Sequence, residues 1–383
     1  MYYQESYSSM KVVIAIDSYK GSASSSELAL HITKGIRQVY NESEIIICPI
    51  ADGGEGTVEA LSCSEGAKLI ELTCKDPLGK SVNAKYTILQ DGVAVIEMAS
   101  ASGLPLVPPH LRNPSITSTY GTGELIVDAI KKGIREFIVG IGGSATNDAG
   151  LGMLRALGFR FFDTSDEEVV YAKDLSKISK IDKTNVLKEL DECKFWIACD
   201  VNNPLYGSNG AAYVYARQKG ADDAMIEQLD SNLRAFAKLV DDDLSQTPGA
   251  GAAGGLGYGF LAFLNATLKS GIKIVLETVK FHEKIIGADF VITGEGRIDK
   301  QSTMGKVIDG IALACREQNV PCIALGGGCS ELDDVIHEKG VSAVFSIMDA
   351  PMCLEEAMEK TKTLALIEKK TQQVFRLIRA SKS

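Results

Sequence analysis

Residues 12–22 read V-V-I-A-I-D-S-Y-K-G-S, and this stretch decides the fold. The apolar run that ends at Asp17 is short and uninterrupted, which is typical of a strand buried on both faces of a parallel sheet. After the turn, Ser24 and Glu27 have the spacing of a capping box, and apolar residues recur at helical intervals over residues 28–39. The stretch therefore predicts a strand, a turn and a helix, the repeating unit of α/β proteins.

The same alternation of strand and helix continues into the next segment and returns near the end of the chain. We expect strands at residues 44–50, 288–293, 321–325 and 341–347, and helices at residues 303–318 and from Leu354 onward. Two strand–helix units cannot bury a parallel sheet alone, whereas they can when joined to three more. We therefore predict a discontinuous Rossmann-like or flavodoxin-like domain made of residues 10–75 and 285–383.

The middle of the chain has a different pattern. Tight connections between short strand-like runs favour antiparallel pairing for residues 67–73, 84–90 and 93–97. Further strands are expected at residues 136–141 and 196–199, and the glycine-rich residues 249–259 are expected to form a loop or a close-packed turn. We predict that residues 76–284 form a mixed α/β domain, so that the chain is an α/β protein of two domains.

Composition narrows the possible functions. The 383 residues are 45% hydrophobic and 23% charged, which excludes a disordered or fibrous chain. The formal net charge of -10 repels phosphate backbones, so we expect no nucleic-acid partner. No apolar run reaches about 18 residues, so we expect no membrane span. Nine cysteines without a C-x-x-C pair are typical of thiols in a reducing cytoplasm, and a zinc site is not expected.

Five segments place small and acidic residues where a strand ends and a helix begins. They are D-S-Y-K-G-S (17–22), A-D-G-G-E-G-T (51–57), G-G-S-A-T-N-D-A-G (142–150), D-V-N-N-P-L (200–205) and T-G-E-G-R-I-D-K-Q-S-T-M-G-K (293–306). Ligands of open α/β sheets bind beyond the carboxyl ends of the strands, where such loops gather. We therefore expect these segments to form the functional site.

Their residue types indicate an enzyme that handles phosphate. The backbone N–H groups of residues 142–147 can cradle an anion, with Ser144 and Thr146 as further donors. One helix end contributes only about 0.3–1 kcal/mol to a nearby charge, so a triphosphate also needs lysines, such as Lys20 or Lys306, and Mg²⁺. Aspartates in the same loops fit that need, because Mg²⁺ prefers oxygen ligands.

Structural alternatives remain open for each residue. For Asp148, capping a helix is at least as good an explanation as catalysis. Asp200 can form a turn by hydrogen bonding to its own backbone. Arg297 can pair on the surface with Glu295 or Asp299, and the lysines can simply be solvated. The G-x-G-x-x-G at residues 249–254 follows no strand, which counts against an NAD-dependent dehydrogenase. A non-enzymatic sensor of a phosphorylated ligand would use the anion cradles but not the many carboxylates.

Taken together, the loops resemble those of the bacterial-type glycerate kinases. The matching motifs, in order, are D-S-Y-K-G-S, A-D-G-G-E-G-T, G-G-S-A-T-N-D, C-D-V-N-N-P-L, G-A-A-G-G-L-G and T-G-E-G-R-I-D. Two residues depart from the family pattern: Tyr19 stands where the family often has Phe, and Ala149 where it often has Gly. The resemblance implies ATP-dependent phosphorylation of D-glycerate with Mg²⁺ in the cytoplasm, with 2-phosphoglycerate favoured as product. It also implies two α/β domains with the active site in the cleft between them. The oligomeric state is left open, a homo-oligomer included.

For this reaction we assign roles to the residues by their chemistry. The catalytic set is Lys20, Asp17, Asp200 and Arg297, in which an aspartate orients or deprotonates the hydroxyl and the arginine binds the carboxylate of glycerate. We expect substrate or phosphate contacts from Ser18, Ser22, Gly53, Gly54, Gly142, Gly143, Ser144, Thr146, Asn147, Asp148, Gly294 and Glu295. The expected magnesium ligands are Asp52, Glu55 and Asp299.

Overall fold

The computed structural model describes residues 10–382 except 52–53, 55, 304–305 and 331–333. By its internal contacts the chain divides into two compact units. Unit 1 consists of Met1–Asp52 and Val275–Ser383, and unit 2 of Gly53–Ile274. Both boundaries differ from the expected ones, because residues 53–75 belong to unit 2 and residues 275–284 to unit 1. The first difference arises because the strand Lys68–Lys75 pairs along its whole length with a strand of unit 2.

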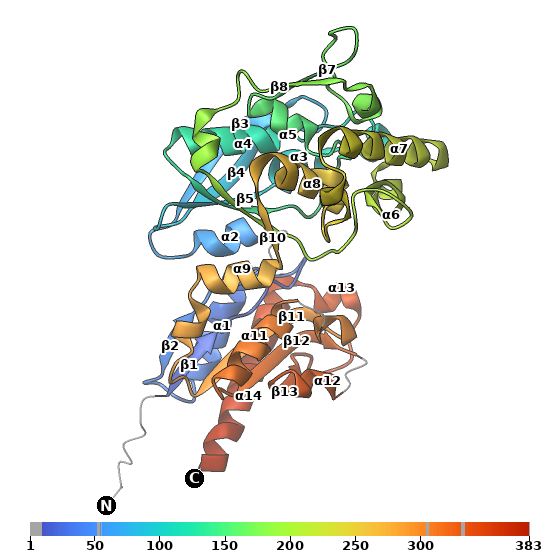
Figure 1. Cartoon of the computed structure of the whole chain (residues 1–383). Helices are drawn as coiled ribbons and strands as arrows, with labels where there is room; N and C mark the ends of the chain where they lie inside the picture. The colour runs from blue at the N-terminus through green and yellow to red at the C-terminus, as the bar shows by residue number, and fades with distance from the viewer. Residues whose placement is uncertain (1–9, 52–53, 55, 304–305, 331–333, 383) are drawn as a thin grey trace, which may run out of the picture. The chain divides into compact units, whose positions relative to one another are not determined.

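Unit 1 is built on a five-stranded, fully parallel sheet. Its strands are β1 (Lys11–Ile14), β2 (Glu44–Ile47), β11 (Phe290–Ile298), β12 (Cys322–Cys329) and β13 (Val341–Ser346). Their spatial order is β13-β12-β11-β1-β2, so the two ends of the chain, blue and orange to red in Figure 1, share one sheet. Within the unit this is the order 2-1-3-4-5 of flavodoxin-like folds, which confirms the predicted α/β class. The topological switch point lies between β1 and β11.

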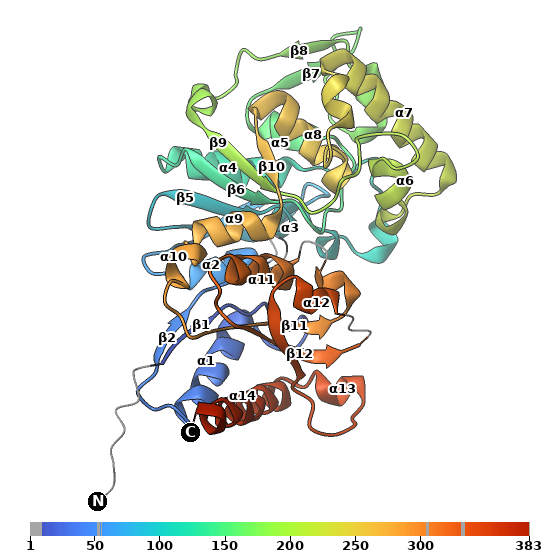
Figure 2. The same cartoon turned by 60° about the horizontal axis from the view of Figure 1, so that its bottom comes forward.

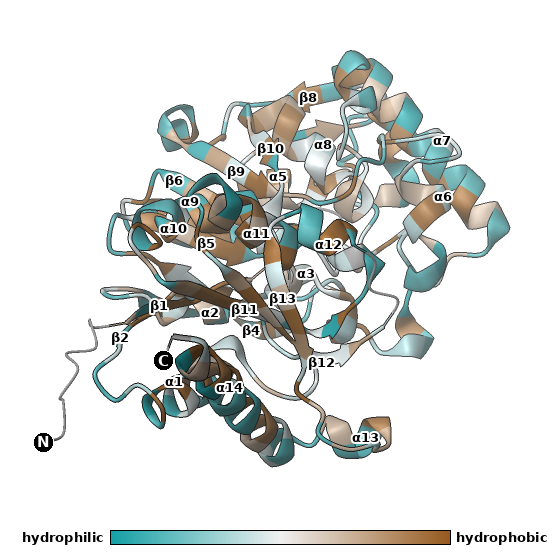
Figure 3. Cartoon of the chain, turned by 90° about the horizontal axis from the view of Figure 1, so that it is seen from below, coloured by the Kyte–Doolittle hydropathy of each residue, from teal (hydrophilic) through white to brown (hydrophobic). Residues whose placement is uncertain are grey.

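Helices cover both faces of this sheet. Figure 3 shows α1 (Ser25–Arg37) and α14 (Lys360–Lys382) on one side, and α11 (Val307–Glu317) and α12 (Val335–Glu338) on the other. Successive residues of β12 serve the two faces, since Ile323 packs in the α1 and α14 core and Ala324 in the α11 core. The same layers can be followed from another side in Figure 2.

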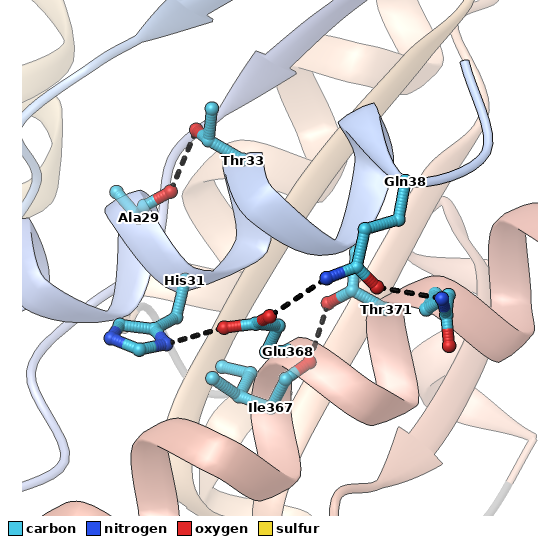
Figure 4. Close-up of polar contacts among 8 residues, drawn as sticks. Ala29, His31, Thr33, Gln38, Ile367, Glu368 and Thr371 are labelled. Atoms are coloured by element: carbon cyan, nitrogen blue, oxygen red, sulfur yellow. Dashed lines mark hydrogen bonds and ion pairs between the residues drawn. The ribbon is translucent and has the colours of Figure 1, made fainter. Parts of the chain in front are cut away.

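The sequence explains how α1 begins and why α14 packs so closely against it. The predicted capping box is present, with Ser24 accepting from the Glu27 N–H and the Glu27 carboxylate accepting from the Ser24 N–H. A Cβ on Gly35 would lie 2.5 Å from the Glu368 carbonyl oxygen, so only glycine allows this approach of the helices. Beside it, Glu368 accepts hydrogen bonds from Gln38 and contacts His31 (Figure 4).

Unit 2 contains a six-stranded mixed sheet in the order β10-β9-β6-β5-β4-β3. The strands are β3 (Lys68–Lys75), β4 (Ser81–Ile88), β5 (Val93–Glu97), β6 (Glu136–Gly140), β9 (Lys194–Ala198) and β10 (Thr267–Lys269). The antiparallel pairing predicted for the first three is confirmed, and from β5 to β10 the neighbours are parallel. The loops after β5, β6 and β9 therefore leave the sheet at one edge. A separate two-stranded antiparallel sheet pairs β7 (Arg160–Phe162) with β8 (Lys180–Asp182).

Helices and short helical turns complete the two units. Those not yet given are α2 (Thr57–Ser62), α3 (Ala99–Ser102), α4 (Tyr120–Lys131), α5 (Leu151–Ala156), α6 (Ala211–Tyr215), α7 (Asp223–Val240), α8 (Ala252–Leu264), α9 (Gly271–Thr278), α10 (Phe281–Lys284) and α13 (Leu354–Ala357). The loop or close-packed turn predicted at residues 249–259 is wrong in its second half. Although α8 is bounded by Ala252 and Leu264, Ala253–Gly255 have left-handed φ and ψ, and the chain is regularly helical only after them. The helix expected from Leu354 onward is two helices, α13 and α14. Among the described residues, no helix combines the length and the apolar character that crossing a membrane requires.

Candidate functional site

A cavity of about 610 Å³ lies in unit 1 at the carboxyl ends of β1 and β11. This is the switch point of the sheet, the position where open α/β folds bind their ligands. Two of the predicted segments meet there, although 270 or more residues separate them in the sequence. The polar residues that line the cavity are Asp17, Ser18, Tyr19, Lys20, Ser22, Glu295, Arg297, Lys306 and Thr363.

The segment after β1 is fixed by short hydrogen bonds. The Asp17 N–H donates to the Gly294 carbonyl (3.0 Å), so the chain stays paired with β11 up to the turn. The Asp17 carboxylate accepts from the Ser18 N–H (2.7 Å), and its side chain is largely buried. Ser22 Oγ lies 2.7 Å from Thr363 Oγ1 of α14. These bonds hold exposed Lys20 at the tip of a rigid turn.

Glu295 is the unusual carboxylate of this cavity. Its Oε1 is buried, and no hydrogen-bond partner is found for it in the described part of the chain. Burial raises the pKa of Glu295, while a hydrogen bond with Ser302 and the charges of Lys306 and Lys20 act in the opposite direction. A buried oxygen without a partner costs free energy, so Glu295 is suited to a cation or a proton donor brought by a ligand.

Arg297 and Asp299 follow on the same strand end. Arg297 Nε lies 3.2 Å from an Asp299 carboxylate oxygen, with the arginine side chain 73% exposed. The surface pairing that the sequence left open is therefore present, and an exposed pair of this kind stabilises the fold little. Arg297 also lines the cavity, so its guanidinium remains at the site. Gly294 is buried, and a Cβ there would meet the Leu325 carbonyl oxygen at 2.0 Å, so sheet packing explains this glycine.

In unit 2, the glycine loop after β6 contacts a lysine that no sequence pattern singles out. Lys219 Nζ donates to Ser144 Oγ (2.7 Å) and to the Thr146 carbonyl (2.7 Å), and the residue is 2% exposed. Burial lowers its pKa to about 7, against the opposing charge of Asp148. Because Lys219 Nζ is the donor in this contact, Ser144 Oγ accepts from it, and the Ser144 proton is available for another acceptor.

Asp148 has a structural environment. Its carboxylate accepts hydrogen bonds from Thr119 N (2.9 Å), Thr119 Oγ1 (2.9 Å), Gly152 N (3.1 Å) and Gly150 N (3.2 Å). It is 1% exposed, and burial raises its pKa despite these donors. These contacts hold the start of α5 against the segment before α4. They favour the helix-cap alternative over direct contact with a substrate.

The glycine-rich start of α8 backs the same loop. A Cβ on Gly254 would lie 2.0 Å from the Thr146 carbonyl oxygen, and its φ of +69° is left-handed. The Ala149 N–H donates to the Gly254 carbonyl (3.0 Å), and Ala149 itself has a φ of 51°. Thr146 Oγ1 and both amide atoms of Asn147 are buried with no partner among the described residues. The loop is therefore tightly packed from behind, while Gly142 and Gly143 are exposed.

Asp200 follows β9, the neighbour of β6, so it leaves the sheet at the same edge as the glycine loop. It is exposed, and its carboxylate accepts from the Gly271 N–H (3.0 Å) at the start of α9. Gly54 accepts from the Thr57 hydroxyl (2.8 Å). The other predicted members of its segment, Asp52, Gly53 and Glu55, lie outside the described residues. Within those residues, no three His, Cys, Asp or Glu side chains are grouped as a metal site.

The predicted residues thus form one set in each unit. Asp17, Ser18, Lys20, Ser22, Glu295 and Arg297 line the cavity of unit 1. Residues 142–148 and Asp200 lie at one edge of the unit 2 sheet. Sequence reasoning missed Lys219, because lysine is usually exposed and nothing in Q-K-G marks burial.

Comparison with known proteins gives one consistent family. The model of the glycerate kinase family matches residues 12–379. A glycerate kinase of Halalkalibacterium halodurans is 44% identical over 92% of this chain and 94% of its own length. Glycerate 2-kinase of Escherichia coli K12 is 45% identical over 91% of this chain and 93% of its own length. A crystal structure from Salmonella typhimurium LT2, of a protein assigned as glycerate kinase 2, superposes with a TM-score of 0.90. It is 40% identical and covers 98% of this chain and 100% of its own.

The family match runs through every segment that forms the two sets described above, and the solved structure has the same fold at full length. The chain belongs to the glycerate kinase family and is an enzyme of that family.

Proposed function

We propose that the chain transfers the γ-phosphoryl group of ATP to D-glycerate, in line and with Mg²⁺, in the cytoplasm. The observation that carries the proposal is the cavity of unit 1, which lies at the switch point of a parallel sheet. There Lys20, Lys306 and Arg297 line the same space as buried Asp17 and half-buried Glu295. Two anionic reactants must be brought together in this reaction, so concentrated positive charge is the first requirement. The names of the relatives, glycerate kinase and glycerate 2-kinase, support the choice of acceptor.

The residues divide the work by their chemistry. Lys20 and Lys306 would neutralise charge on the transferring phosphoryl group, and Arg297 has the planar donor pair that binds a carboxylate. A carboxylate must orient the attacking hydroxyl and accept its proton. Asp17 and Asp200 remain the two proposed residues for that role.

Magnesium fits the oxygen-rich end of the cavity. Glu295 Oε1 is buried without a partner among the described residues, which is the condition of an anionic ligand prepared for a cation. We propose Asp299 and Glu295 as magnesium ligands. Asp52 and Glu55, which the sequence analysis also assigned to the metal, remain proposed ligands. When bound, the ion supplies charge neutralisation to the phosphates.

We further propose that the unit 2 loop takes part in the same reaction. Gly142, Gly143 and Ser144 offer backbone and hydroxyl donors to a phosphate or to the carboxylate of glycerate. Asp148 acts here through the fold of the loop.

A coupled assay of ADP release tests the proposal. We expect ADP release to require D-glycerate, ATP and Mg²⁺ together, and to fall sharply when L-glycerate replaces the D enantiomer. NMR analysis of the product then distinguishes 2-phosphoglycerate, which we favour, from 3-phosphoglycerate. Binding of ATP or glycerate without turnover would identify a sensor and reject the kinase.

A further inference from the structure

The cavity of unit 1 has two chemically different sides. The polar side carries the cations and carboxylates at the ends of β1 and β11. The other side is apolar and consists of residues from the end of β13 to α13: Ile347, Met348, Met352, Leu354, Ala357 and Met358. Phosphoryl transfer itself requires only the polar side and does not account for this second side.

Large apolar side chains on this side of the cavity are exposed to solvent, which favours binding of an apolar group there. Leu354 is 74% exposed and Met358 is 37% exposed, although both line the cavity. Large apolar side chains left in water forgo about 25 cal/mol for each Å² that burial would remove. Methionine thioethers also pack well on aromatic rings, and their flexible side chains adapt to a flat ligand.

The cavity is larger than glycerate alone would fill. At a liquid-like volume of roughly 20–30 Å³ per non-hydrogen atom, glycerate fills about 140–210 Å³. A nucleoside triphosphate with its 31 or so non-hydrogen atoms needs roughly 600–900 Å³ on the same basis. The cavity of about 610 Å³ therefore suits a nucleotide, part of which extends into solvent.

We propose that this cavity is the nucleotide subsite, with the purine base against Met348, Met352 and Leu354 and the phosphates toward Lys20 and Lys306. The proposal rests on the proposed function, since it assigns one reactant of the kinase to unit 1. The arrangement of residues in the cavity also supports the proposal, because the apolar side adjoins the side that carries the cations. A base and a phosphate chain present the same order of apolar and anionic groups.

Binding measurements with two probes test the subsite. ADP carries a base and phosphates, whereas inorganic tripolyphosphate carries phosphates only. Leu354→Asn makes the exposed wall polar without adding charge, and Met352→Gln does so with nearly unchanged shape. Leu377→Asn is the matched control, because Leu377 is 64% exposed on α14 and does not line the cavity.

We expect calorimetry to give an ADP Kd at least about tenfold higher for Leu354→Asn than for wild type, since losing the burial of one leucine has that effect. Met352→Gln should act in the same direction. Tripolyphosphate binding, and the KM for glycerate, should stay within about twofold, and Leu377→Asn should match wild type.

Three results would overturn the subsite: ADP binding unchanged in both wall variants, an equal loss for tripolyphosphate, or no ADP binding by the wild-type protein. A rise in the KM for glycerate with ADP binding intact would reassign the wall to the acid. Failure of the proposed function is a separate result. In that case the wild type binds ADP, with the predicted loss in Leu354→Asn, but does not phosphorylate glycerate.

Discussion

Lys219 offers a quantitative test of the structure around the glycine loop. Burial lowers its pKa from the usual 10.5 to about 7 in the folded chain. Between these two values the unfolded chain holds the proton and the folded chain does not. Stability therefore rises with pH in this window, by about 1.4 kcal/mol for each pH unit. Below pH 7 both states are protonated, and this dependence disappears.

Replacing Lys219 by methionine keeps the apolar stem and removes the titrating group. We expect the free energy of unfolding of wild type, minus that of Lys219→Met, to increase by about 2 kcal/mol from pH 7.5 to pH 9. The absolute difference in unfolding free energy between the two proteins also depends on the lost hydrogen bonds. The test is therefore how this difference changes with pH. Trp196, the single tryptophan, lies in β9 of unit 2 and reports unfolding of that unit by fluorescence in urea.

Lys183→Met is the matched control, because Lys183 is an exposed lysine of the same unit. Its difference from wild type should show no such slope. A flat difference for Lys219→Met over the same range would mean that Lys219 keeps its proton in the folded chain. The lowered pKa that burial gives Lys219 would then be refuted.

Four further substitutions separate effects on chemistry from effects on folding. Lys20→Ala should lower kcat by about 10²-fold or more with an unchanged melting temperature, and near-normal turnover would remove Lys20 from the reaction. Gly254→Ala combines a left-handed φ with an overlap on the Thr146 carbonyl and should destabilise unit 2 by about 2–5 kcal/mol in urea. Gly207→Ala, left-handed with no atom within 4 Å, should cost only about 1–2 kcal/mol; equal losses would contradict the packing argument. Asp148→Asn should weaken hydrogen bonds worth about 2–4 kcal/mol and so lower the melting temperature clearly, while kcat changes little. The opposite pattern would show that Asp148 contacts a substrate.

The sequence predicted most where the signal was local. The capping box at Ser24 and Glu27 and the buried run before Asp17 are short-range patterns, and both elements form as expected. The parallel sheet from both ends followed because a few strand–helix units cannot bury a sheet alone.

Long-range contacts account for what the sequence did not reveal. The boundary after Asp52 depends on β3 pairing with β4, which no local pattern near residue 75 specifies. The burial of Lys219 arises from contacts with Ser144 and Thr146, which are distant in the sequence. No local pattern marks the buried Glu295 oxygen, for which the described part of the chain provides no partner. Glycines 251–259 indicated tight packing correctly, but a helix that starts with left-handed residues has no recognisable sequence pattern.

Phosphorus NMR of one reaction mixture tests the central claim most directly. The protein is incubated with D-glycerate, ATP and Mg²⁺, and the fate of the γ-phosphate is followed. We predict a new phosphomonoester signal that grows in equal amount with ADP and couples to the proton on carbon 2 of glycerate. ATP that remains intact, or a γ-phosphate that appears only as inorganic phosphate, would contradict the account.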